Sequence, residues 1–188
     1  APRTLGLGLT REQVQPVLGI ACLWWSLALL WVKGYPGSAM FWRTKPMRAL
    51  MGILVLAPAW VAAVYLLSFP RGGGLVVLLV VVVATADIGA YFAGKALGGR
   101  FSKGKLAPSI SPGKSWEGFW GGLFMTVAAA LLCMPLFDAP VSDAWRFGIL
   151  GLCTGLFSVA GDLFESLLKR HAQIKDSSSL IPGHGGLL

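Results

Sequence analysis

Five long apolar runs dominate this sequence. Four of them contain no Asp, Glu, Lys or Arg, and they cover residues 13–32, 49–70, 118–137 and 147–161. The remaining run, 72–94, is interrupted only by Asp87. A helix that crosses a bilayer needs about 20 predominantly apolar residues. The runs therefore predict five membrane-spanning helices, at about 14–32, 49–69, 73–94, 116–135 and 147–168.

The composition agrees with this interpretation. Only 13% of the residues are charged and 55% are hydrophobic, with a mean hydropathy of +0.70. Soluble domains usually carry about 25% charged residues. We therefore expect an all-α, polytopic membrane helix bundle that forms a single membrane domain over residues 1–188. Cys22, Cys133 and Cys153 lie within the apolar runs, where an isolated cysteine usually acts as a small hydrophobe.

The basic residues are concentrated in alternate loops. The loops at 33–48, 95–115 and 169–188 would share one side of the membrane, and with the adjoining helix ends they hold 12 of the 16 Lys and Arg residues. By the positive-inside rule, these loops face the cytoplasm. Anionic lipid headgroups alone would also explain Arg43, Lys45 and Arg48.

Asp87 is the one acidic residue inside an apolar run. Counted from Gly72 along a helix, it lies about 20 Å into a hydrocarbon layer of about 30 Å. A carboxylate there costs at least about 2.5 kcal/mol, so it should face the bundle interior or water. Tyr91 and Lys95 fall near the same helix face. Asp87 is then either a functional acid or a structural hydrogen-bonding group between helices.

A second polar group, Ser-Pro-Gly-Lys-Ser-Trp-Glu-Gly at 111–118, precedes the fourth run. Hydroxyl, lysine and backbone N–H groups at a helix start suit a phosphate, and Pro112 with Gly113 predicts a sharp turn. The alternative is that Ser111 or Ser115 merely caps the helix. A P-loop is excluded, because Pro108 stands where the Lys114 match requires glycine, and Leu106 replaces the hydroxyl residue in the match that begins at Gly99.

The run at 147–161 is too short to cross a membrane, since 15 helical residues extend only about 22 Å. The helix should therefore continue and place Asp162, Glu165 and Lys169 within about 60° of one another. Carboxylates and lysines together suit Mg²⁺ and phosphate groups. Glu165 and Lys169 alternatively form only a surface ion pair.

The order of these motifs resembles the phosphatidate cytidylyltransferase (CDP-diacylglycerol synthase) family. The resemblance covers residues 84–188, whereas residues 1–80 match only as apolar spans. Its motifs are Ala-Asp-x-Gly-Ala-Tyr at 86–91, the 111–118 segment, Gly-Asp-Leu-Phe-Glu-Ser at 161–166, Lys-Arg-x₄-Lys-Asp at 169–176 and Pro-Gly-His-Gly-Gly at 182–186.

The resemblance implies a homodimeric, multi-pass enzyme of the bacterial inner membrane, with about nine spans in the complete protein and a cytoplasmic active site. It would convert phosphatidate and CTP into CDP-diacylglycerol and pyrophosphate with Mg²⁺ and a possible second cation, and it would bind no nucleic acid. Catalytic roles are implied for Asp87, Lys114, Asp162, Lys169 and Lys175; substrate contacts for Ser111, Pro112, Ser115, Glu117, Glu165, Arg170, His184 and Gly185; and metal binding for Asp162 and Asp176.

One departure from the family pattern stands at the end of the sequence. The family continues after His-Gly-Gly into an Asp-Arg-x-x-Asp segment with further metal ligands, whereas this sequence ends at Leu187-Leu188. We therefore expect a fragment that lacks this segment and N-terminal spans, and that is inactive by itself. Two other functions stay open: a CTP-dependent polyprenol or dolichol kinase, and an anion transporter.

Overall fold

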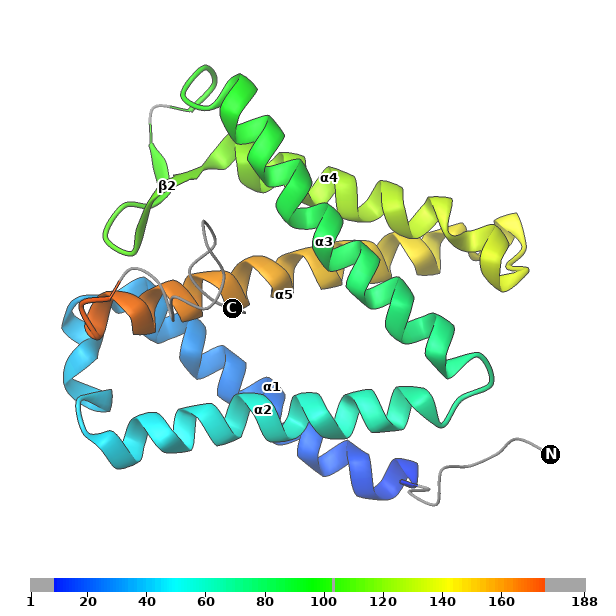
Figure 1. Ribbon diagram of the computed structural model, residues 1–188, viewed down its shortest axis with the longest axis horizontal. Coiled ribbons are helices and arrows are strands. Elements are labelled where there is room, and N and C mark those ends of the chain that lie inside the picture. The colour runs from blue at the N-terminus through cyan, green and yellow to red at the C-terminus, as the bar shows by residue number, and fades with distance from the viewer. Residues whose placement is uncertain (1–8, 103, 175–188) are drawn as a thin grey trace.

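The computed structural model describes residues 9–102 and 104–174 and confirms an all-α architecture. Each of the five predicted helices is present, with ends that differ by a few residues from the predicted ones (Figure 1). Short 3₁₀ helices and one β-hairpin connect them. The elements are α1 (Arg11–Gly34), η1 (Gly37–Trp42), α2 (Lys45–Leu67), α3 (Gly72–Leu97), β1 (Lys105–Ala107), β2 (Ser111–Ser115), α4 (Trp116–Leu132), η2 (Met134–Phe137), η3 (Val141–Asp143) and α5 (Ala144–His171).

Four helical segments are long and apolar enough to cross a membrane: α1, α2, α3 and the stretch Val141–His171 that contains α5. The remaining predicted span, 116–135, is shorter than expected, because α4 has only 17 residues. Pro135 cannot donate the backbone hydrogen bond that would extend α4, and the chain turns into η2 there. The chain is thus a multi-pass membrane protein, while the crossing of α4 stays a prediction.

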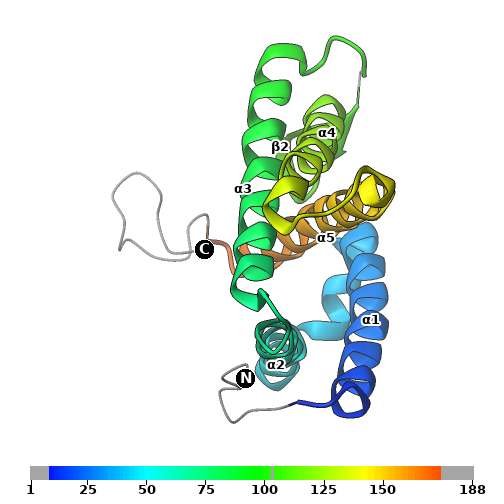
Figure 2. The same ribbon diagram turned by 90° about the vertical axis from the view of Figure 1, so that its right-hand side faces the viewer.

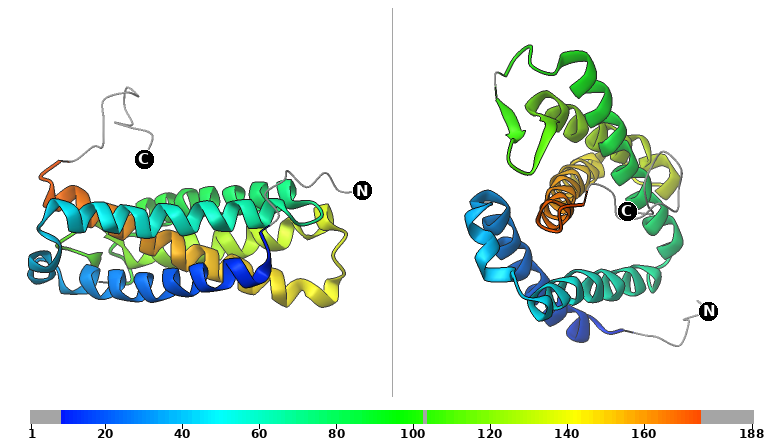
Figure 3. Two further views of the ribbon diagram at one scale, coloured as in Figure 1. Left: turned by 90° about the horizontal axis from the view of Figure 1, so that it is seen from below. Right: turned by 60° about the vertical axis from the view of Figure 1, so that its left-hand side comes forward.

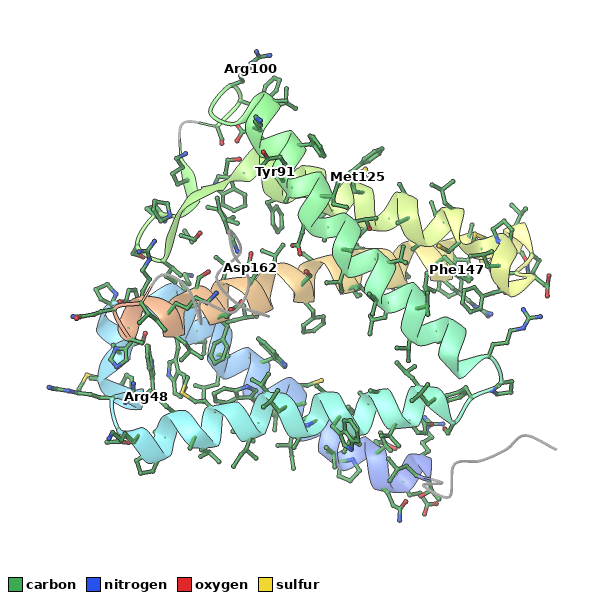
Figure 4. All side chains as sticks on the ribbon, viewed as in Figure 1. Arg48, Tyr91, Arg100, Met125, Phe147 and Asp162 are labelled. Carbon is green, nitrogen blue, oxygen red and sulfur yellow. The ribbon has the colours of Figure 1, made fainter. Side chains whose placement is uncertain are left out.

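The outer surfaces of the helices agree with a lipid environment. Large apolar side chains are widely exposed on all five helices; Leu23 of α1, Leu56 and Trp60 of α2 and Phe124 of α4 are each at least 71% exposed. A soluble protein would bury most of such contiguous apolar surface. Figure 4 shows side chains projecting from the helices along their whole lengths.

Helices α3, α4 and α5 pack closely because small residues line their contacts. A Cβ atom at Gly118 would lie 2.9 Å from the Ala90 carbonyl oxygen of α3, and one at Gly151 would lie 2.7 Å from the Thr126 carbonyl oxygen of α4. Small residues let membrane helices approach until their backbones touch. Figure 2 shows these three helices grouped together, with α1 and α2 beside them.

A buried aromatic cluster joins α1 to the end of α5. The Trp24 ring lies edge-on to Phe164, with ring centroids 5.8 Å apart, and edge-on to Trp31 at 5.6 Å. Trp42 of η1 and Leu167 of α5 are fully buried in the same cluster. This packing holds the C-terminal part of α5 against α1, and the right-hand view of Figure 3 shows the ends of these two helices near each other.

The loop between α3 and α4 contains a feature that we did not predict. Lys105 pairs with Ser115 and Ala107 with Ser111, so β1 and β2 form an antiparallel hairpin. The expected turn at Pro112 and Gly113 is wrong, because both residues lie within β2. They fall where the register shifts, and such irregular strand positions tolerate proline and glycine.

Candidate functional site

A cavity of about 380 Å³ lies between α3, the hairpin, α4 and α5. Its lining combines acidic and basic side chains with glycines and apolar residues. Figure 4 labels Tyr91 on α3 and Asp162 on α5, which both line this cavity. The polar lining residues are Asp87, Tyr91, Lys95, Lys114, Ser115 and Asp162.

Lys114 and Asp162 meet across the cavity as an ion pair between the hairpin and α5. The Lys114 ammonium nitrogen is buried, whereas the Asp162 side chain keeps 49% of its surface exposed. Asp162 lies on α5 because this helix continues to His171, as predicted from the short run at 147–161. The structure thus brings two of the predicted catalytic residues together from segments almost 50 positions apart.

Asp87 enters the same cavity from α3 and is exposed rather than enclosed between helices. Tyr91 and Lys95 lie beside it, as the helical spacing predicted. The Lys95 ammonium lies 3.5 Å from the Tyr91 hydroxyl and 5.6 Å from the centre of its ring. Tyr91 and Lys95 were not among the predicted site residues. Their helical spacing from Asp87 was the sequence signal that could have identified them.

Ser115 has a capping role as well as a place in the cavity lining. Its hydroxyl accepts a hydrogen bond from the Gly118 N–H, 3.1 Å away, at the start of α4. The capping alternative is therefore confirmed for Ser115. A cap of this kind stabilises a helix by about 1 kcal/mol, so the position of Ser115 follows from the fold without any ligand.

Glu117 points to a different part of the chain. Its Oε1 atom accepts hydrogen bonds from the backbone N–H groups of Phe101 and Ser102, at 3.1 and 2.8 Å, and from the Ser102 hydroxyl at 3.1 Å. The side chain is buried. Glu117 thus orders the segment that leads into the hairpin, and it lines a separate apolar cavity of about 370 Å³.

The other predicted residues in the described part of the chain lie outside the cavity lining. Glu165 and Lys169 pair with each other at 2.6 Å, one helical turn apart, as the ion-pair alternative expected, although both side chains are half-buried. Arg170 donates from Nε to the Ile110 carbonyl at 3.0 Å. Ser111 and Pro112 lie on β2 away from the cavity. Four predicted residues, Lys175, Asp176, His184 and Gly185, lie outside the described residues.

The donor set suits a hard cation only in part. Within residues 9–102 and 104–174, no three His, Cys, Asp or Glu side chains lie close enough to hold a metal ion. Asp87 and Asp162 nevertheless face one cavity from two helices. Mg²⁺ is usually held by one or two carboxylates, completed by water and substrate phosphates. Two carboxylates beside a lysine therefore fit Mg²⁺ together with a phosphate ligand.

Comparison with known proteins places the chain in a family. The sequence profile of the cytidylyltransferase family matches residues 4–188. The chain belongs to the cytidylyltransferase family. This family membership confirms the resemblance seen in the motifs and extends it across the N-terminal spans.

Similar proteins of this family come from several bacteria. A phosphatidate cytidylyltransferase of Pseudomonas aeruginosa is 47% identical over 173 residues, which cover 92% of this chain and 62% of the relative. One of Haemophilus influenzae is 42% identical over 187 residues, covering 94% and 64%. The chain thus spans slightly less than two thirds of these relatives. No solved structure matches the chain significantly.

Proposed function

We propose that the protein to which this chain belongs is a CTP:phosphatidate cytidylyltransferase, which makes CDP-diacylglycerol and pyrophosphate. The observation that carries the proposal is the convergence of Asp87, Lys114 and Asp162 in one cavity. These residues come from α3, the hairpin and α5, and they combine carboxylates with a cation. Phosphoryl and nucleotidyl transfer depends mainly on positioning and on neutralising phosphate charge.

The reaction needs little proton transfer. A phosphate monoester has a second pKa of about 6, so phosphatidate is largely dianionic at pH 7. One of its oxygens attacks the α-phosphorus of CTP, a new P–O bond forms, and the bond to pyrophosphate breaks. Lys114 would neutralise charge on the phosphates once they displace its Asp162 partner. A strong general base is therefore unnecessary.

Magnesium is part of the proposal. Asp87 and Asp162 would hold Mg²⁺, with Asp176 as a further predicted ligand outside the described residues. When bound, the ion would neutralise part of the charge on the nucleotide phosphates. A second cation is compatible with the same set of carboxylates.

The proposed setting is the cytoplasmic face of a bacterial inner membrane, with a homodimer as the proposed assembly. Support for the orientation comes from the basic loops, which include the hairpin that carries Lys114. Support for the membrane site comes from the substrates, since phosphatidate is a lipid and CTP is soluble. A site at the membrane boundary would give both of them access.

The test is a labelling experiment with the full-length protein in membranes. CTP labelled at the α-phosphate should transfer its label to lipid, whereas γ-labelled CTP should release its label as pyrophosphate. Omitting Mg²⁺ should stop both. Asp162→Asn should lower turnover by at least about 100-fold, the scale of losing a charged group that stabilises the transition state.

The same experiment separates the alternatives. Transfer of the γ-label to lipid would identify a lipid kinase and overturn the proposal. Anion flux in liposomes without nucleotide turnover would identify a transporter. Near-normal turnover of Asp162→Asn would show that Asp162 has no role in the reaction.

A further inference from the structure

The hairpin that carries Lys114 is attached to α5 at its tip. Ile110, in the turn between the strands, is 2% exposed and lies in the same buried cluster as Trp42 and Leu167. Lys114 follows four residues later on β2 and pairs with Asp162 of α5. The hairpin therefore contacts α5 at two places, the tip and the cavity.

The contact at the tip includes a hydrogen bond from Arg170. Its Nε atom donates to the Ile110 carbonyl at 3.0 Å, from the last turn of α5. Arg170 does not line the cavity, whereas Lys114 and Asp162 do. A two-residue anchor of Ile110 and Arg170 thus sets how the hairpin lies on α5.

We propose that Arg170 is a positioning residue for Lys114, and that it acts through the Ile110 carbonyl rather than by contacting a substrate phosphate. The proposal rests on the cytidylyltransferase function proposed above. Hydrogen bonds from a charged donor are stronger than neutral ones, typically by about a factor of two. Loss of this one would let the hairpin tip move away from α5, and Lys114 would no longer be held against Asp162.

The atom that donates makes the proposal testable. In a glutamine side chain, the amide nitrogen is the same number of bonds from Cα as Nε is in arginine. Arg170→Gln therefore keeps a donor at this position and removes the charge. In a lysine side chain, a methylene occupies the position and the ammonium lies one bond farther out, so Arg170→Lys keeps the charge and displaces the donor. Arg170→Met keeps neither.

The activity test compares these three variants in the full-length protein. If Arg170 positions the hairpin, Arg170→Gln should keep kcat/KM within about threefold of the unaltered protein, while Arg170→Lys and Arg170→Met should lose about tenfold or more. The opposite order, with Arg170→Lys active and Arg170→Gln inactive, would show that the charge contacts phosphate and would overturn the proposal. Absence of CDP-lipid formation by the unaltered protein would overturn the proposed function instead.

A second readout does not depend on activity. Amide hydrogen exchange should become faster across residues 105–115 in Arg170→Lys and Arg170→Met, and should change least there in Arg170→Gln. Exchange across α2 serves as the internal control, and it should be equal in all four proteins if the bundle is folded. Equal exchange of the hairpin in all four proteins would overturn the positioning role even if the proposed reaction is correct.

Discussion

At the scale of single residues, Lys114 is the cation best placed for phosphate. Its ammonium is buried and faces a half-exposed carboxylate in the cavity. Lys114→Met should lower turnover by about 100-fold or more, because transition-state charge would lose its nearest neutralising group. The folded state should lose at most about 1 kcal/mol, since the Asp162 carboxylate that remains is half-exposed to solvent. Activity assays and thermal unfolding in detergent measure the two effects.

Lys105 supplies the matched control for Lys114. It lies on the paired strand of the same hairpin, is exposed, and does not line the cavity. Lys105→Met also removes one positive charge from the hairpin, so a general electrostatic effect would appear in both variants. We expect turnover within about threefold of the unaltered protein, as for most surface substitutions. Equal losses in the two variants would mean that Lys114 acts only through the net charge of the loop.

At the scale of elements, the contact between α3 and α4 sets the shape of the cavity. A Cβ atom at Gly121 would overlap the Cβ of Ala93, and one at Gly89 would lie 2.7 Å from the Met125 Cβ. Gly121→Ala should therefore force the helices apart and destabilise the protein by about 1–3 kcal/mol, the usual effect of overpacking. Asp87 should move with α3, so activity should fall as well. Thermal unfolding and turnover of the same preparation check both.

Gly52 of α2 shows what the same substitution does without a clash. A Cβ atom there would have no neighbour within 4 Å. Alanine is a better helix former than glycine, by about 1 kcal/mol. Gly52→Ala should thus leave stability unchanged or raise it. A destabilisation equal to that of Gly121→Ala would contradict close helix packing as the cause.

The elements also show which parts of the fold a sequence can reveal. Helices α1 to α5 follow from apolar runs, and the shared face of Asp87 and Tyr91 follows from helical periodicity. The hairpin was missed because its tip depends on a partner far along the chain, with Ile110 and Arg170 60 positions apart. The sequence also did not predict that Asp162 lines the cavity while Glu165 does not, for a similar reason. Both residues lie on one polar stripe, and only the hairpin decides which of them faces Lys114.

At the scale of the whole molecule, the loops that hold most of the basic residues are expected at one end of the long axis, which we call the basic end. The hairpin and the C-terminal end of α5 lie at one end of the bundle, and η3 lies at the other (Figures 1 and 3). Ser109 at the hairpin tip and Ser142 in η3 are both exposed. If the basic end is cytoplasmic, these two positions should be reached by water-soluble reagents from opposite sides of the membrane.

Single cysteines at these positions test the orientation. Cys22, Cys133 and Cys153 are first replaced by alanine, which leaves Ser109→Cys or Ser142→Cys as the sole thiol among residues 1–188. A membrane-impermeant maleimide should label Ser142→Cys in intact spheroplasts, and should label Ser109→Cys only after lysis. The reverse pattern would place Lys114 and Asp162 on the outer face. Because CTP is a cytosolic nucleotide, that result would rule out the proposed reaction as well as the orientation, so the topology of the bundle and the chemistry of its cavity are tested together.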